Sequence, residues 1–478
     1  MSNKNLFMRK PICPVLFKHL SAYPCSAEEL YNWHSRQGAL ERLLPPWEDI
    51  SVLARKGGIE PGGMVELKMH AGPFPYRFVA RHIENTPGKM FRDIQEKGPF
   101  AHWSHSHYFS NSVEGSLLHD QVEYSLPGHR FLPRFIKEHV KRSLENLFSH
   151  RQRQLTEDIS LHQRSSTIPL RILISGASGV IGRDLLPLLT TGGHQVYTLV
   201  RRQPDPDKRE IYWDPANGVL NESDLPELDG VIHLAGEYIG LSRWKEEKKR
   251  RVIDSRVKGT KLLARTLASQ KKIPKVFLCA SAVGYYGNGL DKVIVETNPP
   301  GDDFISEVCK VWEKGTRLAR DAGIRTVFMR LGIGLTPQGG ALKHILKSSP
   351  LGFIRRFGTG EQYISWISRD DMVSAMLHIL SCPMLEGPVN IAAPQPVTNA
   401  EFMQTLARIT GRPLLFPLPG WILKMIYGQM ASEILLSGCR VSPLKLQNSG
   451  FRFRHPTLEV ALRSLLGKEL TEETIAQQ

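Results

Sequence analysis

The sequence predicts an α/β protein in which a doubly wound parallel sheet follows an α+β domain. Beyond about residue 170, apolar strand-like runs alternate with helical segments, which is the rhythm of a parallel sheet covered by helices. The first of these runs, RILISGASGVIG at residues 171–182, ends in three glycines spaced three apart. Between about residues 50 and 125, by contrast, short alternating runs are separated by turn-forming residues, as in an antiparallel sheet.

The composition is that of a globular protein with more than one domain. The chain has 478 residues, of which 41% are hydrophobic and 23% charged. No run approaches the roughly 18 consecutive apolar residues of a membrane-spanning helix. The N-terminal stretch MSNKNLFMRKPICPVLF lacks the apolar core of a signal peptide. The 6 cysteines are scattered without a CxxC pair, which favours free thiols and a cytoplasmic location.

The net charge of +15 leaves several partner classes open. No zinc-finger spacing or RNP-type aromatic motif accompanies the basic residues, so no nucleic-acid partner is expected. Charge alone keeps an anionic membrane surface or nucleic acid as a minor alternative. The expected partners are a small-molecule substrate and, for the first domain, a hydrophobic ligand. The sequence leaves the oligomeric state open, with a homodimer as one arrangement.

The first domain is expected over residues 1–155. Residues 26–44 have the pattern of a helix with Ser26 at the N-cap. A second helical stretch at about 131–155 closes the domain, and the polar segment 156–169 is interpreted as a linker. The strands predicted between the two helices are MVELKM, YRFVARHI, MFRDIQ, WSHSHYF and HDQVEY.

The glycine-containing turn of the second domain is predicted to hold a dinucleotide phosphate. Gly176 permits a tight turn, Gly179 lets a pyrophosphate approach the backbone, and Gly182 lets the following helix pack closely on the sheet. The N-terminus of that helix offers free N–H groups to phosphates. An ordinary strand–turn–helix is the alternative, but the strand-before and helix-after context favours the cofactor. The predicted contacts in this turn are Gly176, Ser178, Gly179, Val180, Ile181 and Gly182.

The next two strands suggest which dinucleotide is bound. The second strand ends in Arg201 and Arg202, where an NAD-binding fold has an acidic residue. Arginines at this position suit a 2′-phosphate, which favours NADP over NAD, although two solvated surface arginines are the alternative. The third strand, DGVIHLAGE, ends in a small turn expected to lie against the cofactor ribose. That turn consists of Leu234, Ala235 and Gly236.

Four motifs together resemble those of the extended short-chain dehydrogenase/reductases: GASGVIG, HLAG, SAVGYYG and FGTGEQYISWISRDD. They are most similar to the epimerase family, the nucleoside-diphosphate-sugar epimerase-like branch, from about residue 170 to about 460. The resemblance implies a Rossmann-like domain at 170–400 and a mostly helical substrate-side module at 401–478. It also places Asp214 near the adenine, Arg330 near the end of a core strand, and a substrate-side loop containing Gly358, Gly360, Gln362, Trp366 and Asp371.

The sequence departs from this superfamily at its catalytic motif. Members usually carry a Ser or Thr, a Tyr, and a Lys four residues after the Tyr. The corresponding stretch DDFISEVCKVWEKG contains no Tyr-x-x-x-Lys. The remaining candidates are Ser281 with Tyr285 or Tyr286 to polarise a substrate oxygen, and Lys310 to position the ribose. The alternatives are that the tyrosines pack at a strand end and that the lysine is a solvated helix residue.

The first domain resembles the START-like superfamily, also called SRPBCC or polyketide cyclase/dehydrase. The resemblance rests on the order of elements and on WSHSHYF followed by HDQVEYSLPG. It implies a helix-grip fold around a cavity for a hydrophobic ligand. His105 and His107 share a strand face with Trp103. Two histidines at this spacing can bind zinc, but no third ligand is near in sequence, so a packed aromatic face is favoured and no metal is expected.

Taken together, these features predict an NADP-dependent oxidoreductase or epimerase acting on an unidentified substrate. The alternative is a non-catalytic NADP-binding sensor or ligand-binding protein that has lost the Tyr-x-x-x-Lys chemistry.

Overall fold

The chain forms two compact units, Met1–Leu161 and His162–Gln478, called here the N-terminal and C-terminal units. The computed structural model describes residues 14–72, 74–128, 131–165, 168–240, 242–289, 291–347 and 352–468. Among the described helices, none combines the length and the apolarity needed to cross a membrane.

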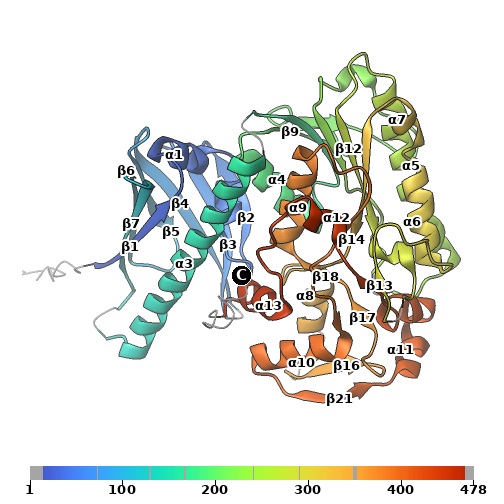
Figure 1. The fold of residues 1–478 in the computed structure, drawn as a ribbon. Coiled ribbons are helices and arrows are strands. Elements are labelled where there is room, and N and C mark those ends of the chain that lie inside the picture. Colours follow the sequence, from blue (N-terminus) through green and yellow to red (C-terminus); the bar gives the residue numbers. More distant parts are fainter. Residues whose placement is uncertain are drawn as a thin grey trace, which may run out of the picture. The chain divides into compact units, whose positions relative to one another are not determined.

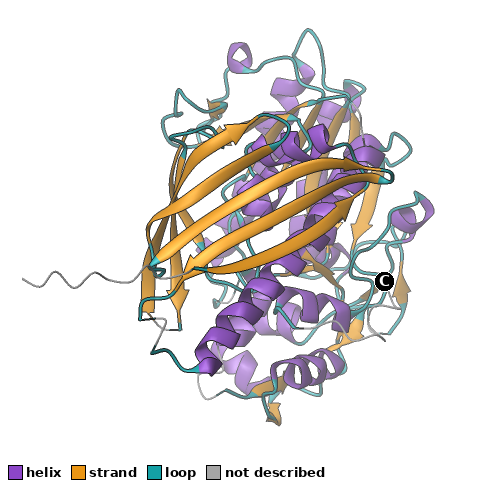
Figure 2. Ribbon diagram, turned by 90° about the vertical axis from the view of Figure 1, so that its left-hand side faces the viewer, coloured by secondary structure: helices purple, strands orange, loops and turns teal. Residues whose placement is uncertain are grey.

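An antiparallel sheet of seven strands forms the N-terminal unit, in the order β1-β7-β6-β5-β4-β3-β2. The five predicted strands are β3 to β7, and β1 and β2 at the two edges were not predicted. Figure 2 shows the sheet twisted and curved. The bounds are β1 (Val15–Tyr23), β2 (Ser51–Lys56), β3 (Met64–Ala71), β4 (Phe74–Thr86), β5 (Met90–Lys97), β6 (His102–Ser112) and β7 (Gly115–Ser125).

Helices cover one face of this sheet. The predicted first helix is divided into α1 (Ala27–Ser35) and α2 (Ala39–Leu43). The break falls at Gly38, whose φ of 95° only glycine adopts at little cost. At the start of α1, Ser26 Oγ accepts a hydrogen bond from the Glu29 N–H at 3.2 Å, as the capping pattern predicted.

The closing helix α3 (Arg134–Ser165) runs across the sheet (Figure 1) and packs on it through Phe148 and Leu155. It extends through most of the stretch interpreted as a linker, so residues 156–165 are helical and that interpretation is corrected. Within this polar segment, Asp158 is fully buried. Its carboxylate pairs with Arg42, at 2.7 Å from both Nε and Nη2.

A parallel sheet of seven strands forms the centre of the C-terminal unit, in the order β10-β9-β8-β11-β12-β14-β19. This order, in which β8 lies inside the sheet between β9 and β11, confirms the predicted doubly wound sheet. The bounds are β8 (Arg171–Ser175), β9 (Gln195–Val200), β10 (Glu210–Tyr212), β11 (Gly230–His233), β12 (Val276–Ala282), β14 (Arg325–Leu331) and β19 (Gly387–Ile391).

Helices flank the parallel sheet (Figure 1). Helix α4 (Val180–Thr191) packs against α9 (Arg369–Ser381), and α5 (Glu246–Ala268) packs against α6 (Phe304–Lys314) and α7 (Arg317–Asp321). Because parallel strands end at one edge, the turn after β8 and the loops after β11, β12 and β14 lie at the same edge. Ligands of doubly wound proteins bind at that edge.

The C-terminal residues share a core with the segments after β14. Phe402 and Leu462, both buried, belong to the same hydrophobic cluster as Leu335 and Trp366. The helices here are α8 (Gly340–Lys347), α10 (Asn399–Thr410), α11 (Gly420–Tyr427), α12 (Leu444–Asn448) and α13 (Leu458–Leu465). Short strand pairs are β13 (Val293–Ile294) with β22 (Arg440–Val441), β15 (Ile333–Leu335) with β18 (Trp366–Ser368), β16 (Ile354–Phe357) with β21 (Leu414–Leu418), and β17 (Tyr363–Ile364) with β20 (Val397–Thr398).

Candidate functional site

The glycine turn after β8 is shaped by close backbone contacts. Gly176 has a φ of 78°, and a Cβ there would lie 2.8 Å from the Ala235 nitrogen. A Cβ on Gly182 would lie 2.4 Å from the Gly176 carbonyl oxygen. Both positions therefore require glycine, for the turn and for close packing of α4.

The surface of the same turn is open. Ser178, Gly179 and Val180 are exposed, and a Cβ on Gly179 would meet only the Gly176 oxygen, at 3.2 Å. Gly179 is the N-cap of α4, and no side chain caps the helix. The N–H groups at this end, including those of Val180 and half-buried Ile181, are therefore left for another acceptor. This cradle fits a pyrophosphate, because backbone N–H groups face an accessible, side-chain-free surface.

A buried histidine ties the glycine turn to the neighbouring loop. His233 Nδ1 lies 2.6 Å from Ser175 Oγ, and His233 Nε2 lies 3.0 Å from Thr260 Oγ1. Burial lowers the pKa of His233 to about 3, so the imidazole is neutral. Ser175 Oγ also accepts from the Ala235 N–H at 3.4 Å. These contacts hold the turn Leu234–Gly236 beside Gly176. The sequence pattern alone did not predict this structural role of His233.

The two arginines after β9 differ in their surroundings. Arg202 Nη2 lies 2.6 Å from Glu210 Oε1 in an ion pair, whereas exposed Arg201 forms no ion pair within the part of the chain that the structure describes. The Asp214 carboxylate forms hydrogen bonds within its own turn. Its Oδ1 accepts from the Ala216 N–H at 3.0 Å, and its Oδ2 accepts from the Asn217 side chain at 2.7 Å. Of these three, Arg201 has the charge most available to an added anion.

A cavity of about 360 Å³ lies at the carboxyl ends of β12 and β14. Most of its lining is apolar, including Val283, Ile305, Leu331 and Phe402. The charged side chains in its lining are Arg256, Asp303 and Glu433. The cavity also includes Gln362 of the predicted substrate-side loop, whereas Trp366 and Asp371 of that loop are fully buried in the core.

Arg256 of α5 lies between this cavity and the turn at Gly236. Its guanidinium stacks on Trp312, with Cζ 4.6 Å from the ring centroid, and Nη1 donates to the Glu237 carbonyl oxygen at 3.1 Å. A Cβ on Gly236 would lie 3.2 Å from Arg256 Cζ. Among the described residues, no acceptor meets the buried Arg256 Nε. No sequence pattern pointed to this residue, because it follows a strongly basic stretch that resembles a solvated helix face.

Two of the four predicted catalytic residues belong to a buried polar network. Ser281 Oγ donates to Glu313 Oε1 at 2.8 Å, and Glu313 pairs with Arg330. Tyr286 donates to Asn390 Oδ1 at 2.7 Å and accepts from Arg330 Nη1 at 2.9 Å. Burial raises the pKa of Tyr286 to about 12.

The other two lie outside this network's hydrogen bonds. The half-buried ring of Tyr285 is stacked under Arg330, with Cζ 3.5 Å from the ring centroid. Lys310 is half-buried on α6, and its Nζ lies 2.7 Å from Glu307 Oε2. The cavity is lined by Ala282, Val283, Gly284 and Cys309 from this region, and not by Ser281, Tyr285, Tyr286 or Lys310. Burial raises the pKa of Cys309 to about 12, so its thiol is protonated.

The N-terminal unit has a cavity of its own, of about 460 Å³. It is lined by apolar residues such as Leu43, Phe78 and Phe148, and by the polar residues His34, Asp93, His105, His107 and Arg151. The predicted helix-grip arrangement thus encloses a space of ligand size with a polar wall on the sheet side.

Comparisons with known proteins match each part of the chain. Family models match for "NAD dependent epimerase/dehydratase family" at residues 172–392, "Polyketide cyclase / dehydrase and lipid transport" at 23–153, and a domain of unknown function (DUF1731) at 418–465. An epimerase family protein of Mycobacterium bovis is 38% identical over 61% of this chain and 96% of its own length.

Two solved structures extend the similarity. The nucleoside-diphosphate sugar epimerase from Corynebacterium glutamicum is 32% identical, with a TM-score of 0.77 over 97% of this chain and 92% of the other. The human epimerase family protein SDR39U1, solved with NADPH, is 35% identical, with a TM-score of 0.57 over 62% of this chain and 99% of the other.

Proposed function

Because this chain belongs to the epimerase family of NAD(P)-binding proteins, with an N-terminal polyketide cyclase-type domain, we propose that its C-terminal unit is an NADP(H)-dependent oxidoreductase for a small, mostly apolar substrate. The observation that carries the proposal is the cavity of about 360 Å³ at the sheet edge that also holds the glycine turn. The cofactor, when bound, supplies or accepts hydride.

The chain's own residues account for cofactor binding in this proposal. The uncapped end of α4 and the open surface at Gly179 receive the pyrophosphate. Arg201 receives the 2′-phosphate, since Arg202 is already paired with Glu210. The human relative at 35% identity was solved with NADPH, which supports the choice of NADP(H) over NAD(H).

The cavity lining suggests the class of substrate. Its mainly apolar wall favours a hydrophobic body, and the buried Arg256 Nε needs an acceptor. A carbonyl or carboxylate oxygen placed against the guanidinium of Arg256, which lines the cavity, would pair with its positive charge and orient the reacting carbon. Asp303 and Glu433 also line the cavity, but each already accepts backbone hydrogen bonds at the start of α6, from the N–H groups of Ser306 and Ile305 respectively.

A second candidate function is NADP(H) binding without turnover. The observation that favours it is the engagement of Ser281 with Glu313 and of Tyr286 with Asn390 and Arg330. A phenol held protonated in a buried network is a poor proton donor to a substrate in the neighbouring cavity.

A titration with NADPH and NADH, followed by nicotinamide fluorescence, tests the cofactor assignment. Wild type should prefer NADPH, and Arg201→Ala should lose that preference. Arg202→Ala is the matched control and should reduce the preference for NADPH over NADH less than Arg201→Ala does. If neither nucleotide binds, both candidate functions fail.

Turnover separates the two candidates. NADPH oxidation with a panel of apolar aldehydes and ketones should be detectable in wild type and lost in Arg256→Met, with NADPH affinity retained. Tight NADPH binding without oxidation by any compound of the panel would favour the second candidate.

A further inference from the structure

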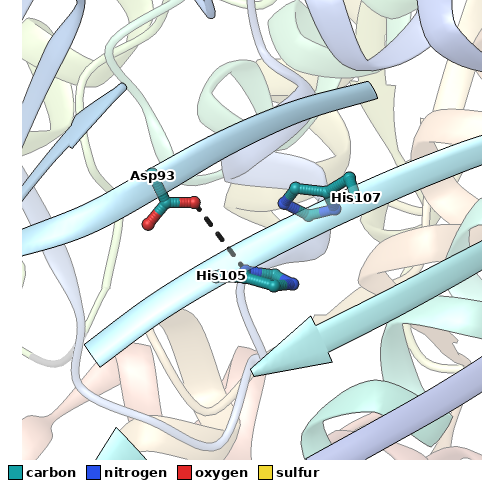
Figure 3. A group of neighbouring side chains, drawn as sticks. All are labelled: Asp93, His105 and His107. Atoms are coloured by element: carbon teal, nitrogen blue, oxygen red, sulfur yellow. Dashed lines mark ion pairs between the residues drawn. The ribbon is translucent and has the colours of Figure 1, made fainter. Parts of the chain in front are cut away.

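The polar wall of the N-terminal cavity is built by cross-strand register. Asp93 on β5 lies opposite His105 on β6, and His107 follows two residues later on the same face. Figure 3 shows the Asp93 carboxylate and the two imidazoles gathered on this face. All three residues line the cavity of about 460 Å³. The sequence offered no third ligand beside the two histidines, but the pairing of β5 with β6 supplies one.

The three side chains offer ligand atoms at metal-binding separations. One atom from each residue lies within 4.8 Å of the others. His105 Nδ1 is 3.8 Å from Asp93 Oδ2, too far for a hydrogen bond. Donors on one tetrahedral ion with bonds of about 2.0–2.1 Å lie about 3.3 Å apart. A contraction of about half an ångström would therefore bring this pair to bonding separation.

Asp120 on β7 holds the two histidines from the side away from Asp93. Its Oδ1 lies 3.1 Å from His105 Nε2, in a hydrogen bond, and 2.7 Å from His107 Nδ1, in a close charge contact. A carboxylate behind a histidine fixes the ring orientation in many metal sites. Asp120 does not line the large cavity, whereas Asp93, His105 and His107 do.

The wall also contains polar atoms that have no hydrogen-bond partner among the residues that the structure describes. No described residue donates a hydrogen bond to the Asp93 carboxylate, although that side chain is only 13% exposed. His82, which pairs with Asp93 across β4 and β5, has a buried Nδ1 with no hydrogen-bond partner among the described residues. Arg151 lines the same cavity but forms no ion pair with either aspartate within the described ranges. A buried carboxylate without a hydrogen-bond donor is costly, and a bound cation would lower that cost.

We propose that Asp93, His105 and His107 bind one divalent transition-metal ion of the Zn²⁺ type, that Asp120 positions the two histidines, and that the remaining coordination position faces the cavity. Two imidazoles and one carboxylate suit such ions and leave a position for water or for a ligand oxygen. The N-terminal unit would then select cavity ligands with an oxygen donor at one end of an apolar body.

Zinc binding to the full chain tests this site. The purified protein is stripped with a chelator and titrated with Zn²⁺ in competition with a chromophoric chelator. One equivalent per chain is expected, and it should be lost in Asp93→Asn and in His107→Asn. His119→Asn is the matched control, because His119 is on β7 but alternates to the opposite face from Asp120. Unchanged binding in the two site variants, or equal loss in the control, would overturn the proposal.

Cobalt substitution keeps the test decisive even if a site variant fails to fold. Wild-type protein loaded with Co²⁺ should show visible d–d absorption without a thiolate charge-transfer band, since the proposed ligands contain no sulfur. A thiolate band would place the ion on cysteines and overturn the assignment.

The affinity for Zn²⁺ tests the positioning role of Asp120. Asp120→Asn should retain one equivalent of Zn²⁺ but weaken its affinity about 10–100-fold. An affinity equal to that of wild type, in a variant whose thermal midpoint has changed, would show that Asp120 serves folding alone.

Discussion

Arg330 and Glu313 form a bidentate ion pair inside the C-terminal unit, with Nε 2.9 Å from Oε1 and Nη2 3.0 Å from Oε2. The two side chains are only 4% and 10% exposed. Ser281 donates to the same Oε1, and Tyr286 accepts from Arg330. Ser281 and Tyr286, two of the candidate catalytic residues, are therefore joined to a buried charge pair.

Removing one charge of this pair should destabilise the protein. Glu313→Gln leaves the Arg330 guanidinium buried without its counter-charge, which typically costs about 3–5 kcal/mol. The measurement is the free energy of unfolding in urea. Glu307→Gln on the same helix is the control: Glu307 is exposed and its ion pair with Lys310 is open to solvent, so no measurable change is expected. Equal effects of the two substitutions would contradict the buried role of the pair.

Removing the hydroxyl group should lower the free energy of unfolding at Tyr286 but not at the adjacent Tyr285. Tyr286→Phe removes a group that donates to Asn390 and accepts from Arg330, and should lower the free energy of unfolding by about 1–3 kcal/mol. Tyr285→Phe keeps the ring that stacks under Arg330 and should be nearly neutral. Urea unfolding measures both, and NADPH affinity should be retained in each. A neutral Tyr286→Phe variant that loses turnover would instead assign Tyr286 a catalytic role.

The stability of the C-terminal unit should decline as the pH falls from about 6.5. The reason is that His233 has a folded-state pKa of about 3 because of burial, so the unfolded chain binds a proton that the folded chain does not. The free energy of unfolding should therefore fall by up to about 1.4 kcal/mol for each pH unit between about pH 6 and pH 4. Urea unfolding at several pH values should show this slope in wild type and a shallower one in His233→Gln. The exposed His344→Gln serves as control and should keep the wild-type slope.

Alanine substitutions at two glycines of the turn after β8 should have different effects, one on stability and the other on cofactor binding. Gly182→Ala would place a methyl group 2.4 Å from the Gly176 oxygen and should cost about 1–3 kcal/mol of stability. Gly179→Ala places a methyl group 3.2 Å from the Gly176 oxygen, a milder contact than at Gly182, and on the open surface of the turn. It should lower the free energy of unfolding less than Gly182→Ala and weaken NADPH binding about tenfold or more. The reverse pattern would mean that the pyrophosphate does not lie at Gly179.

Much of the architecture follows from local patterns in the sequence. Strand–helix alternation and the spacing of Gly176, Gly179 and Gly182 predicted the parallel sheet and its first turn, since periodicity and turn formation depend on neighbouring residues. The same reasoning missed edge strand β2, which is mostly exposed and so lacks an alternating pattern. It also ended α3 too early, because Asp158 is buried only through its pair with Arg42, more than a hundred residues away.

By itself, the sequence determined the order of elements, the glycine turn, the family motifs and the absence of Tyr-x-x-x-Lys, all of which are local or compositional features. Only the tertiary structure decided what the polar residues contact. It joined Ser281 to Glu313, buried Arg256 Nε without an acceptor among the described residues, and set Asp93 beside His105. Such contacts depend on strand register and helix packing between distant segments, and a buried charge becomes distinguishable from a solvated one only when those segments meet.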